Sequence, residues 1–286
     1  MADERDVRAL PFFDRPVEVQ PLSGGLTNQN FRATTRDGRA FAVRFGTDDP
    51  VLGIDRRNEI ACTRAAAELG IAPEILWCSD GAMVAEFVAG GPMEPTTVAA
   101  NVARIAAVLR RIHDAGPMVT GHLSWFSPFL VARTYVRFAR DRGLPLPGGA
   151  GADGLLGEVA ALEARMAPFV PTFCHNDLMP GNLMDDGQRI AVIDWEYAGF
   201  GHPLFDLAGL SSNCELTAEQ DRELLRCHGD DGDAAHGQFL VLKAMAALRE
   251  SLWAVLQIAL SEIEFEYDAY RDDNHRKYVA YRDALP

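Results

Sequence analysis

Residues 174–182, CHNDLMPGN, and the nearby residues 192–196, VIDWE, decide the fold prediction. In the first segment, Asp177 and Asn182 flank a Pro-Gly turn that can fold the chain back on itself. In the second, Asp194 ends a short apolar run that can pair with the strand beginning at Asn182. The sequence therefore predicts that three oxygen-bearing side chains converge from two neighbouring loops.

These side chains have the chemistry that phosphoryl transfer requires. The reaction needs a carboxylate that orients the acceptor hydroxyl and takes its proton, and hard oxygen ligands for Mg²⁺. Asp177 is the candidate base, and Asn182 and Asp194 are the candidate metal ligands. Asp and Asn are also ordinary turn residues, but the apolar run that ends in Asp194 weighs against this simpler interpretation.

The chain before residue 90 has the pattern of short strands with one helix. Asp55 is a candidate N-cap for a helix at residues 55–69, and Gly70 a candidate stop. An Asp-Gly pair at residues 37–38 predicts a hairpin turn. Strands are expected at residues 17–22, 30–35, 40–45, 76–78 and 82–88. A break at residues 89–92 predicts two domains, 1–90 and 91–286.

The rest of the chain is mainly helical in pattern. Thr97 is a candidate cap for a helix whose apolar residues follow helical spacing, and residues 143–157 are expected to form a flexible loop. Two strands are expected at residues 182–184 and 189–193, and helices at 217–227 and 235–265. The predicted fold class is α+β, with a small N-terminal antiparallel sheet lobe carrying one helix and a larger helical C-terminal lobe.

Composition narrows the class of protein. The chain has 286 residues and a formal net charge of −14, which argues against non-specific binding to nucleic acid and suits a cationic substrate, although acidity also serves solubility. Five cysteines without a C-x-x-C pair argue against a disulfide framework or structural zinc. No signal peptide or membrane-spanning run is apparent, so we expect a cytoplasmic protein.

Two features in the first domain are consistent with nucleotide binding. Arg44 lies in an apolar strand and needs a partner, which Glu59 on the next helix can provide. An outward-facing arginine on an edge strand is the alternative. Between two expected strands, residues 23–30, SGGLTNQN, combine paired glycines with short donors that can approach phosphate, or form a simple turn. The candidate phosphate-binding residues are Ser23, Gly24, Gly25, Thr27 and Asn28.

The pattern His175-x-Asp177-x4-Asn182, followed by residues 193–196, resembles the catalytic and metal-binding loops of the aminoglycoside phosphotransferase and choline kinase superfamily. Its members share the protein-kinase fold. The resemblance implies ATP and two Mg²⁺ ions, with Asn182 and Asp194 at ligand positions. It also implies a supporting role for His175 and a bracing role for Asp206, which could otherwise be a helix N-cap.

The resemblance extends to the first domain. Residues 23–28 are similar to the phosphate loop of choline kinases. At the position of Arg44 most superfamily members have lysine, whereas many choline and ethanolamine kinases have arginine, as this chain does. Residues 86–88 match the linker whose backbone receives adenine, which implies contacts from Glu86 and Val88.

The C-terminal helix bears on the acceptor. Trp253 would share a helix face with Glu250, Gln257 and Glu264, and an aromatic ring beside carboxylates suits a cation. A core position is the alternative for Trp253.

This segment resembles that of choline and ethanolamine kinases, in which an aromatic cage holds the ammonium group. The resemblance implies cage positions for Trp253, Phe265 and Tyr270 and a place near the acceptor for Tyr197. Glu250 stands where a second cage tryptophan is expected, and Glu196 could add negative charge near the ammonium.

We therefore predict an ATP-dependent kinase that phosphorylates the hydroxyl of a small cationic amino alcohol, first choline and then ethanolamine. Residues 177–182 resemble bacterial choline kinases of the lipopolysaccharide-modification type more than animal choline kinases. Alternatives are a kinase for thiamine, an aminoglycoside or a sugar, and a catalytically silent nucleotide-binding pseudokinase.

Overall fold

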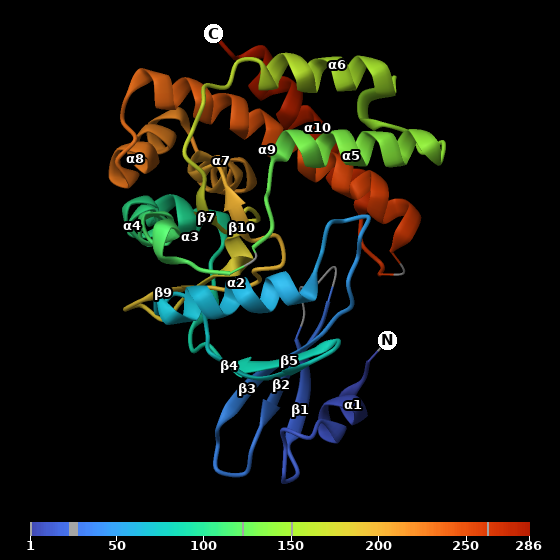
Figure 1. The fold of residues 1–286 in the computed structure, drawn as a ribbon, viewed down its shortest axis with the longest axis vertical. Helices are drawn as coiled ribbons and strands as arrows, with labels where there is room; N and C mark the ends of the chain where they lie inside the picture. Colours follow the sequence, from blue (N-terminus) through green and yellow to red (C-terminus); the bar gives the residue numbers. More distant parts are fainter. Residues whose placement is uncertain (1, 23–27, 122, 150, 262) are drawn as a thin grey trace. The chain divides into compact units, whose positions relative to one another are not determined.

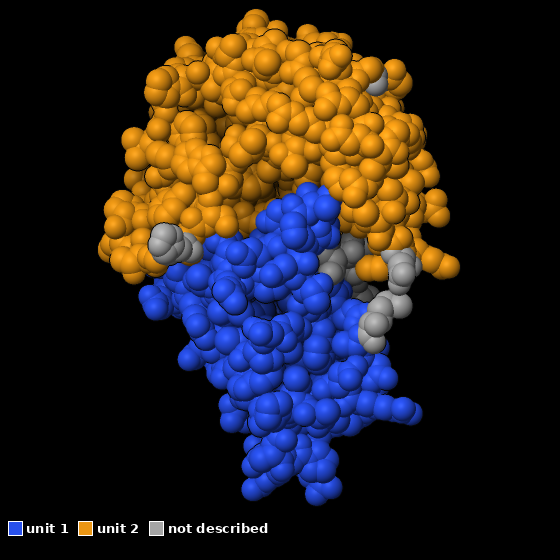
Figure 2. All heavy atoms as spheres, turned by 45° about the vertical axis from the view of Figure 1, so that its right-hand side comes forward, with its two compact units in different colours: residues 1–92, 182–196 blue, residues 93–181, 197–286 orange. Residues whose placement is uncertain are grey.

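The computed structural model describes residues 2–22, 28–121, 123–149, 151–261 and 263–286. The chain forms two compact units (Figure 2). Unit 1 comprises residues 1–92 and 182–196, and unit 2 comprises residues 93–181 and 197–286. Among the described residues, no helix has the length and apolar character needed to cross a membrane.

Unit 1 is built on a five-stranded antiparallel sheet in the order β1-β2-β3-β5-β4 (Figure 1). Alternate residues of the central strands are buried, and Phe31, Phe41, Val43 and Val84 form the core beneath the sheet. The predicted Asp-Gly turn joins β2 to β3, with Gly38 at φ +86°. The strands are β1 (Glu18–Leu22), β2 (Gln29–Thr34), β3 (Ala40–Phe45), β4 (Ile75–Ser79) and β5 (Ala82–Glu86).

Two helices and a second small sheet complete unit 1. Helix α1 (Glu4–Ala9) packs on β1, and α2 (Arg56–Glu68) packs on β4. Asp55 caps α2 through the backbone N–H groups of Arg57 and Asn58, as predicted. The second sheet has the order β6-β8-β9, from β6 (Gly91–Pro92), β8 (Leu183–Asp185) and β9 (Ile190–Val192).

Unit 2 is mainly helical, and its longest helix is α9 (Asp233–Leu260), which packs against α5, α7 and α10 (Figure 1). The other helices are α3 (Pro95–Ala100), α4 (Val102–Asp114), α5 (Pro128–Asp141), α6 (Ala152–Glu163), α7 (Pro203–Cys214), α8 (Ala218–His228) and α10 (Tyr267–Asp283). A two-stranded sheet pairs β7 (Thr172–Cys174) with β10 (Gly199–Gly201). The α+β class, with its N-terminal antiparallel sheet and larger helical part, is confirmed.

Four element predictions were wrong. The chain before residue 90 carries two helices, α1 and α2, where one was expected. Thr97 lies inside α3 and does not cap a helix, because Pro95 starts α3 earlier and Asn101, at φ −123°, separates it from α4. Residues 152–157, expected in a loop, begin α6, whose apolar side is buried despite two glycines. The helix expected to reach residue 265 ends at Leu260, where the backbone becomes extended.

Candidate active site

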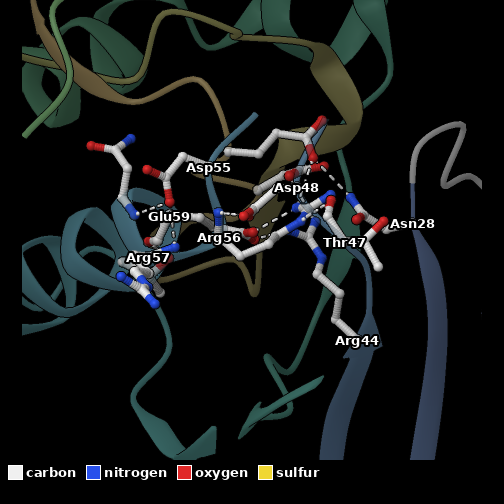
Figure 3. Close-up of polar contacts among 12 residues, drawn as sticks. Asn28, Arg44, Thr47, Asp48, Asp55, Arg56, Arg57 and Glu59 are labelled. Carbon is white, nitrogen blue, oxygen red and sulfur yellow. Dashed lines mark hydrogen bonds and ion pairs between the residues drawn. The ribbon is translucent and has the colours of Figure 1, made fainter. Parts of the chain in front are cut away.

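Arg44 is the centre of an ionic network in unit 1 (Figure 3). Strand β3 carries its side chain, which forms an ion pair with Glu59 from α2. A second guanidinium nitrogen, Nη2, lies 2.7 Å from Oδ1 of Asp194. Burial alone would lower the pKa of Arg44, but the charges of Asp194, Glu59 and Glu196 outweigh it and raise this pKa. The guanidinium is thus held as a cation by two carboxylates, and the edge-strand alternative does not apply.

Asp194 reaches Arg44 because the backbone turns sharply after β9. Its φ of +68° is in the left-handed region, which non-glycine residues seldom adopt outside functional or tightly held positions. The preceding residue, Ile193, donates its backbone N–H to the carbonyl of Asn182 at 3.0 Å. The hairpin of β8 and β9 therefore places the backbones of the two candidate metal ligands, Asn182 and Asp194, side by side.

A second arginine, Arg56, extends the network and was missed in the sequence. Its Nη1 lies 2.6 Å from Oε2 of Glu59 and 3.1 Å from Oε2 of Glu196. The signal was its place one turn before Glu59 on α2, where two side chains face each other. Asn28 donates from Nδ2 to the same oxygen of Glu196 at 3.0 Å. Glu196 is thus bound within unit 1.

Glu196 carries a perturbed carboxyl group. Burial and the nearby charge of Asp194 raise its pKa to about 7, and Arg44, Asn28 and Arg56 only partly oppose this. The network holds three carboxylates, from Glu59, Asp194 and Glu196, against two guanidinium groups. When Glu196 is ionised, one negative charge is in excess among these described residues, and a cation beside them would favour that ionised form.

The remaining candidate nucleotide-binding residues are Ser23, Gly24, Gly25, Thr27, Glu86 and Val88. Ser23, Gly24, Gly25 and Thr27 lie outside the described residues. Glu86 is exposed at the end of β5, where its backbone N–H donates to the carbonyl of Glu74. Val88 follows β5 and is half-buried.

In unit 2, Asp206 fixes the backbone before Asp177. Its carboxylate accepts the N–H of His175 at 2.9 Å and the N–H of Asn176 at 2.6 Å. It also lies 3.0 Å from Nε2 of His113. Burial would raise the pKa of Asp206, but the hydrogen bond and charge of His113, with His175, lower it overall. The N-cap of α7 is His202, so the N-cap alternative for Asp206 is wrong.

This bracing holds a strained loop. Asn176 has a φ of +64° and donates from Nδ2 to the carbonyl of Tyr197 at 3.1 Å. His175 is fully buried, and its Nδ1 accepts the backbone N–H of Asp177 at 3.3 Å. The loop is therefore fixed on both sides of the candidate base. Asn176, Asp177 and Leu178 line a small cavity of unit 2 together with residues of α7 and α9.

Arg249, on α9, contacts the candidate base directly and was missed in the sequence. Its Nη1 lies 2.6 Å from Oδ1 of Asp177 and 2.7 Å from Oε1 of Glu250. Its guanidinium also lies over the ring of Tyr197, 4.5 Å from the centroid. The available signal was an arginine on a helix rich in apolar residues, because a buried charge needs a partner.

The predicted cage residues form an aromatic cluster in unit 2. Trp253 lies 5.9 Å from Tyr267 and 6.1 Å from Tyr270, and Phe265 packs on both tyrosines, all measured between ring centroids. Trp253 is buried, so it belongs to the core as well as to this cluster, whereas Phe265 is 40% exposed. Glu264 lies beyond the end of α9, and so it does not share the helix face of Trp253.

Comparison with known proteins identifies the family. A sequence model of the phosphotransferase enzyme family matches residues 18–239. Probable choline kinase 1 of Arabidopsis thaliana is 26% identical over 303 aligned residues, covering 92% of this chain and 86% of the relative.

Two solved structures are similar over nearly the whole chain. A choline/ethanolamine kinase family protein from Mesorhizobium loti superposes with a TM-score of 0.81 at 29% identity, covering 98% of this chain and 93% of the other. The choline kinase LicA from Streptococcus pneumoniae superposes with a TM-score of 0.79 at 26% identity, covering 93% and 94%. The resemblance drawn from the motifs is confirmed: this chain belongs to the phosphotransferase enzyme family, as an ATP-dependent alcohol phosphotransferase of protein-kinase-like fold.

Proposed function

We propose that this enzyme phosphorylates the hydroxyl of a small cationic amino alcohol, with choline and ethanolamine as the first candidates. The main observation that supports this proposal is that Arg44 forms ion pairs with both Glu59 and Asp194. Kinase-like phosphoryl transfer uses a strand cation that links a helix glutamate to the phosphates beside a metal-binding aspartate. The relatives named as choline and ethanolamine kinases support the class of acceptor.

In this proposal the nucleotide is held by residues 1–90 and the acceptor by residues 91–286. Arg44 and the loop of residues 23–28 bind the phosphates of ATP, and the backbone of residues 86–88 receives adenine. Glu59 keeps Arg44 in place.

Asn182 and Asp194 would hold Mg²⁺. Their side chains carry the hard oxygen donors that this ion prefers, and their backbones lie side by side in the β8–β9 hairpin. Bound Mg²⁺ would neutralise charge on the phosphates. Glu196, held between Asn28 and Arg56, adds negative charge to the same network.

Asp177 orients the acceptor hydroxyl and takes its proton. His175 and Asp206 support the loop that carries it. The acceptor ammonium is received by Trp253, Phe265, Tyr270 and Tyr197, with Glu250 beside them. Aromatic faces attract such cations by about 0.5 to 2 kcal/mol per contact.

The test is an acceptor panel with purified enzyme, ATP and Mg²⁺, in which ADP release is measured for choline, ethanolamine, thiamine, an aminoglycoside and a sugar. We expect turnover with choline or ethanolamine at least tenfold above the acceptor-free rate. Turnover only with another acceptor would replace the proposed substrate class, and no turnover with any acceptor would favour a silent nucleotide-binding protein.

A further inference from the structure

Glu250 connects the candidate base to the aromatic cluster. Its Oε1 accepts from Nη1 of Arg249, which also contacts Asp177, and its Oε2 accepts from the hydroxyl of Tyr270 at 2.8 Å. It also lines the same cavity of unit 2 as Asp177 and Arg249. A group bound at Glu250 therefore lies between the base and the rings of the cluster.

Among the described residues, carboxyl groups outnumber guanidinium groups around Glu250. Two carboxylates, from Asp177 and Glu250, share the one guanidinium of Arg249, and the same nitrogen contacts both. Glu250 is 7% exposed and Arg249 is 3% exposed, so water compensates little of the excess negative charge. Burial raises the pKa of Glu250, with Asp177 adding to the effect and Arg249 and Tyr270 opposing it. A cationic ligand would restore the balance.

Glu250 also has unused hydrogen-bonding capacity. Each carboxylate oxygen can accept two hydrogen bonds, and each accepts one from the described residues. An ammonium group with N–H protons can fill these positions with charge-assisted hydrogen bonds, which are roughly twice as strong as neutral ones. A quaternary ammonium has no such proton and can offer only its charge and its methyl groups.

We propose that Glu250 makes this acceptor site select an ammonium group that carries N–H protons over a quaternary ammonium. The proposal rests on the proposed function and narrows its acceptor class to primary, secondary and tertiary amino alcohols, with ethanolamine ahead of choline. Trp253, Tyr270 and Phe265 then pack against the carbon chain and the outer face of the ammonium.

The test compares kcat/KM for ethanolamine, its N-methyl and N,N-dimethyl derivatives, and choline. Each step adds one methyl group, but only the last step removes the final N–H. We expect the largest fall in kcat/KM at that step, by about tenfold or more; a tenfold fall corresponds to about 1.4 kcal/mol. Equal falls at every step, or a rise toward choline, would overturn the proposal while leaving the proposed function intact.

Two variants complete the test. Glu250→Gln keeps the size of the side chain and removes its charge, so the ethanolamine-to-choline ratio of kcat/KM should fall about fivefold or more. Glu158→Gln is the matched control, because Glu158 also accepts from a tyrosine hydroxyl, Tyr278, and from an arginine, Arg282, on α10. The control should keep the wild-type ratio.

The outcomes separate the two claims. An unchanged ratio in Glu250→Gln, with both acceptors still phosphorylated, would contradict the role of Glu250. If the wild-type enzyme phosphorylates no member of the series, the proposed function fails and the specificity proposal fails with it. The wild-type series needs no variant, so a poorly folded Glu250→Gln protein would not prevent a decision.

Discussion

Arg249 is the side chain that holds the candidate base in position. Its Nη1 contacts Asp177, its guanidinium carbon lies over the ring of Tyr197, and its Nε has no hydrogen-bond partner among the described residues. Burial opposes its charge, but Asp177 and Glu250 outweigh burial and raise the pKa of Arg249. We therefore regard Arg249 as a positioning residue for Asp177.

Replacing Arg249 should slow the reaction more than it weakens nucleotide binding. In Arg249→Ala the Asp177 carboxylate loses its anchor, and a misplacement of about 1 Å can cost about a hundredfold in kcat. The KM for ATP should stay within about twofold of wild type. Steady-state kinetics at saturating acceptor measures both. Arg249→Lys should recover part of kcat, and a wild-type kcat in Arg249→Ala would refute the role.

The buried side chain of His202 should make the protein less stable in acid. Burial lowers its pKa to about 4, and Asp230 and the hydrogen bond of Gln238 only partly oppose this, while His113 adds to it. Its neutral Nδ1 accepts the N–H of Leu204 as the N-cap of α7. The unfolded chain binds a proton at this residue near pH 6.5, and the folded chain does so only near pH 4. The contribution of His202 to the free energy of unfolding is therefore complete above pH 6.5 and is lost as the pH falls towards 4.

Between pH 7.5 and pH 5 the expected contribution of His202 to this loss is about 2 kcal/mol. His202→Asn keeps a side-chain acceptor at the N-cap without a titrating group. Between pH 7.5 and pH 5 the free energy of unfolding of this variant should therefore fall by about 2 kcal/mol less than that of the wild type. Urea unfolding at the two pH values measures the difference. Parallel pH dependence in variant and wild type would show that His202 does not titrate as described.

The sequence predicted some contacts of the site but not others. The pairing of Arg44 with Glu59 followed from a charge in an apolar strand and an acidic residue in the first turn of the next helix. Arg56 and Arg249 were missed because their partners, Glu196 and Asp177, are 140 and 72 residues away in sequence. Local patterns do not show which distant carboxylate a buried guanidinium will contact.

At the scale of elements, α9 organises unit 2 through a buried ion pair. Nζ of Lys243 lies 2.7 Å from Oδ2 of Asp221 on α8 and donates to the carbonyl of Leu216 at 3.1 Å. Asp221 also accepts the hydroxyl of Ser211 on α7. Three helices thus meet at one pair of buried charges. Breaking such a pair leaves a buried charge uncompensated.

Lys243→Met should therefore lower the free energy of unfolding by about 3 to 5 kcal/mol. The double variant Lys243→Met with Asp221→Leu removes both charges and should recover much of the loss. Urea unfolding of the two variants and the wild type gives the comparison. A single variant that loses less than about 1 kcal/mol, or a double variant no more stable than the single, would contradict this account.

Elements with a strong local signal were predicted well, and those with conflicting signals were not. Strands β2 and β3 alternate buried and half-buried residues, and an Asp-Gly turn fixes the hairpin between them. Helix α6 was missed because Gly154 and Gly157 suggest a loop, yet Leu155, Val159 and Leu162 are buried along one side. The end of α9 was misplaced because helix-compatible residues continue past Leu260.

At the scale of the whole molecule, the candidate catalytic residues are divided between the units. Asp177 belongs to unit 2, and Asn182 and Asp194 belong to unit 1. Four residues, 178–181, join the base to the first candidate metal ligand. Among the described residues, each unit carries a cluster in which carboxyl groups outnumber guanidinium groups by one, in line with the formal net charge of −14. Cations, as metal and as acceptor, are the ligands that this distribution favours.

The division predicts that nucleotide binding and acceptor chemistry can be separated by mutation. The most direct measurement is turnover and ATP affinity of Asp177→Ala, with ethanolamine and choline as acceptors and isothermal titration for ATP·Mg²⁺. We expect turnover to fall by about a thousandfold or more, as for loss of a base, and ATP affinity to stay within about twofold of wild type. Wild-type turnover in this variant would contradict the central assignment of Asp177 as the base that activates the acceptor hydroxyl.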